Sequence, residues 1–90
     1  MGTFRWPGWW EWDLDLSPHL LKRMEDRRFT EIDLRAMLGR ATGLERELLP
    51  GRWLVTTRQR GRAWSIIIEP DPILEVIVVV TAYPAERKKK

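Results

Sequence analysis

Few side chains in this sequence of 90 residues could do chemistry, and the first of them is its single histidine, His19. Arg23 and Arg27 follow at intervals of four residues, so on a helix all three lie along one side. A neutral imidazole can take the proton of a ribose 2′-hydroxyl, and guanidinium groups can hold the adjacent phosphate. The residue types and spacing therefore fit general-base chemistry on RNA. The alternative is structural: His19 fixes a helix start through a backbone hydrogen bond, and the arginines form ordinary salt bridges with nearby acids.

Arg58, Arg60 and Arg62 form a second group of candidates around a predicted hairpin turn. An arginine-rich hairpin can contact phosphates or enter a nucleic-acid groove. The alternative is a hairpin tip whose charges only keep the protein soluble. The formal net charge is +3, and positive charge gathers on this hairpin and on residues 87–90. This pattern attracts a polyanion such as RNA.

Tyr83 is a third candidate, near the end of the last apolar stretch. Strand alternation predicts that Tyr83 and Thr81 share a face with Ile77 and Val79. If that face is open to solvent, Tyr83 could stack on a base or donate a proton to a leaving oxygen. The alternative is an amphipathic residue at the rim of the core.

Tryptophan is dense near the start of the chain, at Trp6, Trp9, Trp10 and Trp12. Such a cluster could stack single-stranded bases, or it could pack at the margin of a sheet or against a partner. The chain has no cysteine and one histidine, which excludes disulfides and argues against a transition-metal site. No glycine-rich phosphate loop or dinucleotide fingerprint is present, so we expect neither metal nor cofactor.

The strands that would position these residues follow from alternation. Residues 9–16 alternate apolar and acidic side chains, which predicts a half-buried strand rich in tryptophan. Three further strands are predicted later in the chain, with a hairpin turn at 59–61 and a turn at 70–72. They span residues 52–58, 63–69 and 73–83, and the last is nearly continuous in β-branched residues.

Two helices are predicted between the first strand and the others. Ser17 followed by Pro18 is a helix start, and this first helix should end at about residue 28. His19 then lies in the first turn, where the helix dipole favours the neutral ring. Thr30 and Asp33 form a capping-box pattern that opens the second helix.

This order of elements predicts an α+β two-layer sandwich, strand-helix-helix-strand-strand-strand. We expect an antiparallel sheet with both helices on one face and the first strand at an edge. The length fits a single domain over residues 1–90, with a core at about 9–83 and a disordered basic tail at 84–90. No apolar run approaches the roughly 20 residues of a membrane helix and no secretory leader is evident. We therefore expect no membrane contact and a cytoplasmic location.

The central helices resemble a family of small bacterial and phage-associated domains of unknown function. The shared pattern is a histidine, an arginine-methionine pair, a second arginine and a threonine cap, here His19, Arg23, Met24, Arg27 and Thr30. Those domains end in threonine-x-tyrosine, and Thr81-Ala82-Tyr83 stands in that place. Arg28 departs from the family, which has a small residue there, and Phe29 replaces the usual isoleucine.

That family looks like part of the wider RelE/ParE-like grouping, which shares this order of strands and helices. Many of its members are toxins that cleave RNA without a metal, and others inhibit gyrase. The resemblance implies an RNA-binding domain, possible ribonuclease activity and the following roles. His19 is the base, Arg23 and Arg27 hold the phosphate, Tyr83 makes a contact at the rim, and the Arg58, Arg60 and Arg62 hairpin docks RNA.

Two other interpretations stay open. A non-catalytic module could pair its tryptophan-rich edge strand with a partner protein such as an antitoxin, because an exposed edge strand is a template for such pairing. The domain could also be a structural remnant of a mobile element. Neither the residues nor the resemblance decides whether the chain is an enzyme, which RNA it binds or whether it forms a homodimer.

Overall fold

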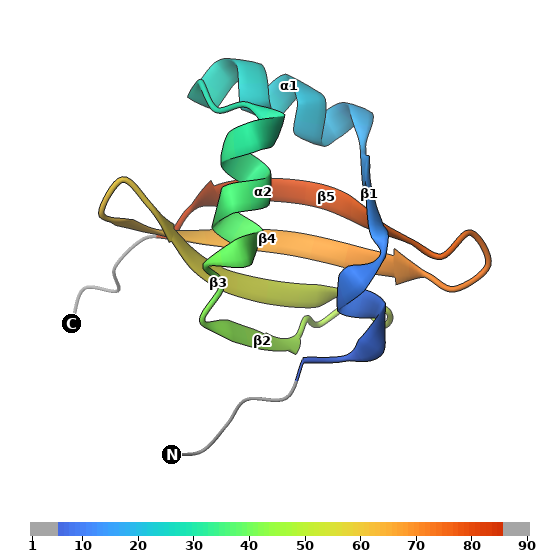
Figure 1. Cartoon of the computed structure of the whole chain (residues 1–90). Coiled ribbons are helices and arrows are strands. Elements are labelled where there is room, and N and C mark those ends of the chain that lie inside the picture. The colour runs from blue at the N-terminus through green and yellow to red at the C-terminus, as the bar shows by residue number, and fades with distance from the viewer. Residues whose placement is uncertain (1–5, 86–90) are drawn as a thin grey trace, which may run out of the picture.

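The computed structural model of this chain describes residues 6–85 and shows an α+β fold, with two α-helices and a five-stranded mixed sheet (Figure 1). The basic tail predicted at 84–90 lies outside the described residues from 86 onward. The elements are η1 (Gly8–Glu11), β1 (Asp13–Leu16), α1 (Pro18–Arg27), α2 (Glu31–Gly39), β2 (Gly43–Arg46), β3 (Trp53–Gln59), β4 (Arg62–Asp71) and β5 (Val76–Pro84). No helix in this part of the chain has the length and apolar character needed to cross a membrane.

The sheet has the strand order β1-β5-β4-β3-β2. The predicted antiparallel meander of the last three strands is confirmed, and so is an edge position for the first strand. The prediction of a wholly antiparallel sheet is wrong, because β1 runs parallel to β5. The sequence analysis also missed β2, a short edge strand that pairs antiparallel with β3. Its four residues contain only one apolar side chain, Leu44, so alternation is too weak to reveal it.

The first strand is much shorter than predicted. Residues 8–11 form a 3₁₀ turn, and only residues 13–16 pair with β5. Trp9 contacts both Trp10 and Trp53, with ring centroids 6.1 Å and 5.6 Å apart, so this turn folds over the sheet toward β3. The expected tryptophan-rich edge strand is therefore wrong: the edge strand Asp13–Leu16 contains no tryptophan.

Both helix starts are confirmed. Ser17 caps α1, and its Oγ accepts a hydrogen bond from the Leu20 N–H at 3.0 Å. Thr30 and Asp33 form the predicted capping box of α2, with reciprocal bonds of 3.1 Å and 2.9 Å. Local side-chain chemistry thus fixes where each helix begins.

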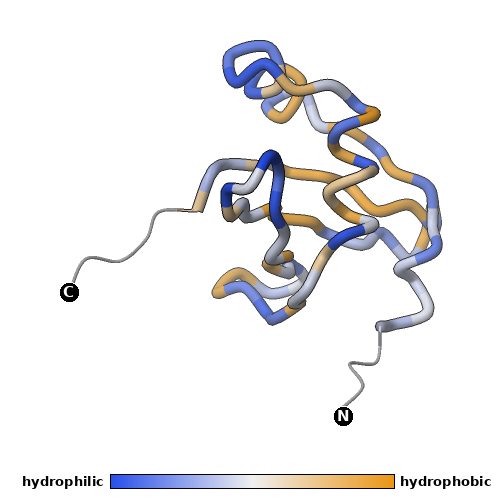
Figure 2. The backbone as a smooth tube through the Cα atoms, turned by 60° about the vertical axis from the view of Figure 1, so that its left-hand side comes forward, coloured by the Kyte–Doolittle hydropathy of each residue, from blue (hydrophilic) through white to orange (hydrophobic). Residues whose placement is uncertain are grey.

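The core lies between the helices and one face of the sheet. Figure 2 shows apolar stretches of the chain running through the sheet. Fully buried side chains come from both helices and from the three central strands, and include Leu20, Leu34, Met37, Val55, Ile66, Ile68 and Val79. Thr57 is also buried and donates a hydrogen bond from its Oγ1 to the Met37 carbonyl, which ties the end of α2 to β3.

One irregularity lies between β4 and β5. Ile67 is opposite Thr81 but Ile68 is opposite Val79, so Val80 is an extra residue in β5. The carbonyl of Val80 accepts a hydrogen bond from the Ser17 Oγ at 3.0 Å. Ser17, the N-cap residue of α1, therefore also forms a hydrogen bond with the extra residue of β5.

Candidate functional site

His19 and Arg23 lie together in the first half of α1. His19 is exposed, and Arg23 donates from its Nε to the His19 Nε2 at 3.4 Å. Arg23 also lies 3.9 Å from the Asp26 carboxylate. The predicted placement of these two side chains on one side of the helix is thus present, on an exposed surface.

Arg27 has a different environment. It is half-buried at the end of α1, and its Nη1 donates a hydrogen bond of 2.8 Å to the carbonyl of Ala82 in β5. A helix rises about 1.5 Å per residue, so Arg27 lies about 12 Å along α1 from His19. Arg27 ties helix to sheet and does not sit beside the imidazole.

Tyr83 does not join these residues. Because of the extra residue Val80, Thr81 and Tyr83 lie on the face of β5 opposite to Val79, so the predicted common face is wrong. Ala82 is buried toward the helices, and Tyr83, the next residue, is 37% exposed on the other side. The structure therefore separates Tyr83 from α1.

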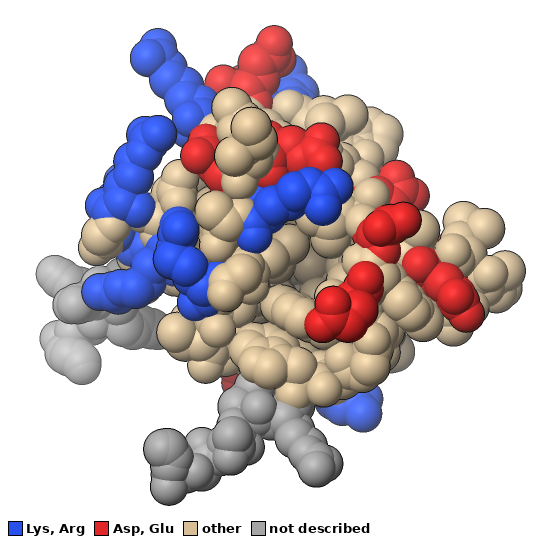
Figure 3. Space-filling view, viewed as in Figure 1, with Lys and Arg blue, Asp and Glu red and all other residues tan. Residues whose placement is uncertain are grey.

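A basic hollow of about 160 Å³ lies where the end of α1 meets the β3–β4 hairpin. We call it the arginine hollow. Its lining residues are Arg27, Arg28, Phe29, Gln59, Arg60, Arg62 and Trp64. Figure 3 shows basic side chains following this margin of the molecule, whereas acidic side chains dominate the opposite margin. The arginine hollow thus unites arginines that are distant in sequence.

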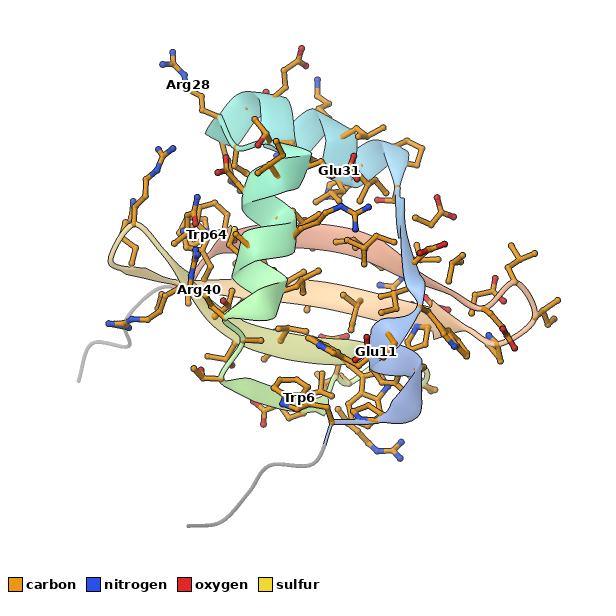
Figure 4. The ribbon with its side chains drawn as sticks, in the orientation of Figure 1. Trp6, Glu11, Arg28, Glu31, Arg40 and Trp64 are labelled. Atoms are coloured by element: carbon orange, nitrogen blue, oxygen red, sulfur yellow. The ribbon has the colours of Figure 1, made fainter. Side chains whose placement is uncertain are left out.

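An aromatic pair forms the floor of the arginine hollow. Phe29 and Trp64 meet edge to face, with centroids 5.2 Å apart, and they are only 5% and 7% exposed. Figure 4 shows Trp64 beneath the side of α2 near the base of the hairpin, and Arg28 pointing outward from the end of α1. The arginines therefore surround a buried apolar base, with Arg28 at the outer rim.

Two arginines at the arginine hollow have left-handed backbone conformations. Arg28 ends α1 with φ 57° and ψ 51°, and Arg60 opens the hairpin turn with φ 54°. Gly61 follows at φ 78°, so the turn has the paired positive φ values of a tight two-residue hairpin. The predicted turn is confirmed, although arginine stands where asparagine or glycine is favoured.

A side-chain network fixes the hairpin against α2. Arg40 donates from its Nη2 to the Gln59 Oε1 at 2.6 Å and to the Arg58 carbonyl at 3.0 Å. Gln59 is 9% exposed and points toward the helices, and Figure 4 shows Arg40 at the base of the hairpin. The position of the hairpin is therefore set by residues that the sequence analysis did not single out.

Asp33 continues this network to the start of α2. The backbone N–H of Thr30 donates to its carboxylate and lowers the pKa of Asp33, and the Gln59 side chain and the positive charge of Arg60 lower this pKa further. The signal that could have found Gln59 is its place in β3: it is a polar residue at the inward position after Val55 and Thr57.

The three predicted docking arginines divide between the two sides of the hairpin. Arg60 and Arg62 line the arginine hollow together with Arg27. Arg58 lies on the other side of β3 from its neighbour Gln59 and does not line it. The structure therefore places Arg27, which was predicted to be catalytic, beside Arg60 and Arg62, which were predicted to dock RNA.

The tryptophans near the start pack on one another and on the sheet. Trp6 and Trp10 have ring centroids 4.4 Å apart, and Trp9, Trp10 and Trp12 lie against the buried core. These contacts favour the packing interpretation over an open stacking platform.

The chemistry available at the arginine hollow is electrostatic. Guanidinium groups bind phosphate through paired, charge-assisted hydrogen bonds. Among residues 6–85, no group of three or more histidine and acidic side chains is placed to hold a metal ion. Comparison with protein-family models, curated proteins and solved structures finds no match to this chain.

Proposed function

We propose that this domain binds RNA through its phosphate groups and that the arginine hollow is the principal contact. The observation that carries the proposal is the convergence of Arg27, Arg28, Arg60 and Arg62 on one hollow. These arginines come from the end of α1, the inter-helix turn and the hairpin. Positive charge is thus concentrated at the arginine hollow, whereas the opposite margin of the molecule is acidic. This asymmetry favours the approach of a polyanion from the side of the arginine hollow.

The guanidinium groups at the rim are available to a ligand. Within residues 6–85, the side chains of Arg28, Arg60 and Arg62 make no hydrogen bond or ion pair, although the charge of Arg60 acts on Asp33. Arg27 uses its Nη1 on the Ala82 carbonyl and keeps other N–H groups. We therefore assign phosphate contact to Arg28, Arg60 and Arg62, with Arg27 completing the wall.

This arrangement supports binding more directly than cleavage. The predicted base, His19, lies about 12 Å along α1 from Arg27. A RelE/ParE-like ribonuclease is the second candidate, and the pairing of His19 with Arg23 is the observation in its favour.

The test is the salt dependence of RNA binding, measured by fluorescence anisotropy with a labelled single-stranded RNA. Each phosphate contact contributes about −0.7 to the slope of log K against log salt, so three arginines contribute about −2. A rise from about 50 to about 200 mM KCl then weakens binding about 18-fold through these contacts. The variant Arg28→Gln/Arg60→Gln/Arg62→Gln should lose this part of the slope.

A control variant that removes the same amount of positive charge elsewhere distinguishes binding at the arginine hollow from a general electrostatic attraction of RNA to the protein. Lys22→Gln/Arg35→Gln/Arg46→Gln removes as many positive charges from exposed positions elsewhere. We expect this control to keep most of the slope, and equal losses in both triple variants would refute the proposal. The same RNA, incubated in EDTA, should stay intact. Cleavage that His19→Ala abolishes would instead establish the ribonuclease.

A further inference from the structure

The sheet has a second face, which we call the outer face, on the side away from the helices. In Figure 1, α2 crosses the near face of the sheet, and no helix of residues 6–85 lies behind it. Side chains alternate along a strand, so the residues between the core positions of β3, β4 and β5 point to the outer face. Ile67 is one of them: it is 6% exposed but does not belong to the core cluster. The outer face therefore has apolar packing of its own.

An apolar stripe crosses the outer face. Leu54 in β3 lies directly opposite Ile67 in β4, and Val78 in β5 lies diagonally next to Ile67. Val76 continues the stripe along β5. Leu54, Val76 and Val78 are partly exposed, so they supply the accessible apolar surface above Ile67. The solvent face of an antiparallel sheet is normally polar, and an apolar stripe in this position indicates a contact surface.

Acidic side chains flank this stripe on both edge strands. Asp13 and Asp15 of β1 lie beside the two valines, and Glu45 of β2 lies beside Leu54. All three acidic residues are exposed, and none of their carboxylates has a hydrogen bond or ion pair with any residue in 6–85. The formal net charge of the whole chain is +3, so this negative charge is a local feature of the outer face.

The acidic flanks distinguish between the possible occupants. In a twofold dimer with aligned strands, β1 of one copy faces either β1 or β2 of the other. Acidic side chains would then meet acidic side chains, which opposes the pairing of two copies. The same charges repel RNA and anionic membranes. The complementary partner is therefore apolar along its centre and positively charged on both sides.

We infer that the outer face binds an amphipathic helix of a partner protein, with lysine or arginine on both sides of its apolar stripe. From Val76 to Leu54 the stripe runs about 13 Å along the strands and about 10 Å across them, which is about 16 Å in all. A helix of about eleven residues, or three turns, covers this length. The stripe and its acidic flanks share no residue with the arginine hollow, so the inference does not rest on RNA binding.

The test uses a labelled synthetic helix of leucine and lysine as the probe, with about 14 residues and leucine along one side. Fluorescence anisotropy with the full chain at low salt should show saturable binding. One control peptide has the same composition in scrambled order, and a second has glutamate in place of lysine. We expect both controls to bind about tenfold more weakly or less, and equal binding of either control would overturn the inference.

Charge variants locate the binding site. Each exposed ion pair contributes up to about 1 kcal/mol, so loss of the three acidic flanks should weaken binding of the leucine-lysine peptide about tenfold at low salt. That variant is Asp13→Asn/Asp15→Asn/Glu45→Gln. The matched control, Glu11→Gln/Glu25→Gln/Asp26→Asn, removes the same charge from exposed positions on η1 and α1 and should change binding little. Equal losses in the two triple variants would refute the assignment to the outer face.

Apolar variants test the stripe. Leu54→Thr/Val78→Thr keeps residues that favour strands but removes apolar surface, and should weaken peptide binding about tenfold. Ile32→Thr, at a position 79% exposed on α2, is the control and should leave binding unchanged. Urea unfolding checks that both variants are folded. Undiminished binding in the folded double variant would refute the inference, and so would a dimer of the chain alone that this variant dissociates.

Discussion

Substitution of Arg27 tests most directly whether an arginine of the arginine hollow stabilises the fold or binds phosphate. Its guanidinium reaches the Ala82 carbonyl at 2.8 Å and joins the end of α1 to β5. Arg27→Met keeps the aliphatic stem and most of the volume but removes the donor. We therefore expect a loss of stability that does not depend on any ligand.

The expected size follows from the geometry. A hydrogen bond with a charged partner contributes about 1.5 to 3 kcal/mol, and partial exposure of Arg27 puts this bond at the low end. A loss of about 1.5 kcal/mol lowers Tm by about 6 to 12 °C in a domain of this size. Urea unfolding, followed by tryptophan fluorescence, measures the midpoint and the slope m together.

Arg23→Met is the matched control because Arg23 lies one turn earlier on the same helix. Its ion pair with Asp26 is long, at 3.9 Å, and exposed, so we expect a change within about 0.5 kcal/mol. Equal losses in the two variants would refute a structural role for the Arg27–Ala82 bond. Unchanged stability of Arg27→Met with weakened RNA binding would identify Arg27 as a phosphate ligand alone.

Two further predictions concern the ends of the helices. Arg28 has a left-handed backbone, so Arg28→Gly should raise the free energy of unfolding by up to about 1 kcal/mol while weakening RNA binding. Urea unfolding and anisotropy measure the two effects, and a less stable glycine variant would contradict the first. Asp33 has a lowered pKa in the fold, so its contribution to stability is fully present above its ordinary value of 3.8 and is lost as the pH falls through the lower folded value. Asp33→Asn should remove this part of the acid dependence of Tm, and an unchanged acid profile would contradict the assignment.

The helices could be predicted because their signals are local. Ser17 with Pro18, and Thr30 with Asp33, satisfy the first N–H groups of each helix within a few residues of sequence. The alternation of β3 and β4 was likewise readable, since every second side chain packs beneath the helices. These features need no knowledge of the rest of the chain.

The sheet edges and the irregularity in β5 could not be read in this way. The parallel pairing of β1 with β5 joins segments about sixty positions apart, and alternation alone does not state direction. Val80 lies in a run of valines, where nothing local marks one residue as extra. The wrong face for Tyr83 follows directly, because one unpaired residue reverses every later side chain.

The residues of the candidate site also divide into those that the sequence could predict and those that it could not. Hairpin arginines were visible as a cluster in the sequence, and their turn was predicted at the right place. Their meeting with Arg27 depends on how α1 ends over the sheet, which is a tertiary relationship. The network of Arg40, Gln59 and Asp33 depends on the same docking: the alternation of β3 could mark Gln59 as facing inward, but it could not name the partners of Gln59.

Two residues of the arginine hollow have a backbone conformation that bears on the proposed phosphate contact. A left-handed conformation costs a residue other than glycine roughly 1 kcal/mol, and Arg28 and Arg60 both have it. Glu75 has a similar φ in the distant β4–β5 turn, so a positive φ alone does not mark a site. Arg28 and Arg60 differ in that both line one hollow above the same aromatic floor. Glycine at either position would cost the fold less, and the presence of arginine at both is consistent with the phosphate contact proposed for their guanidinium groups.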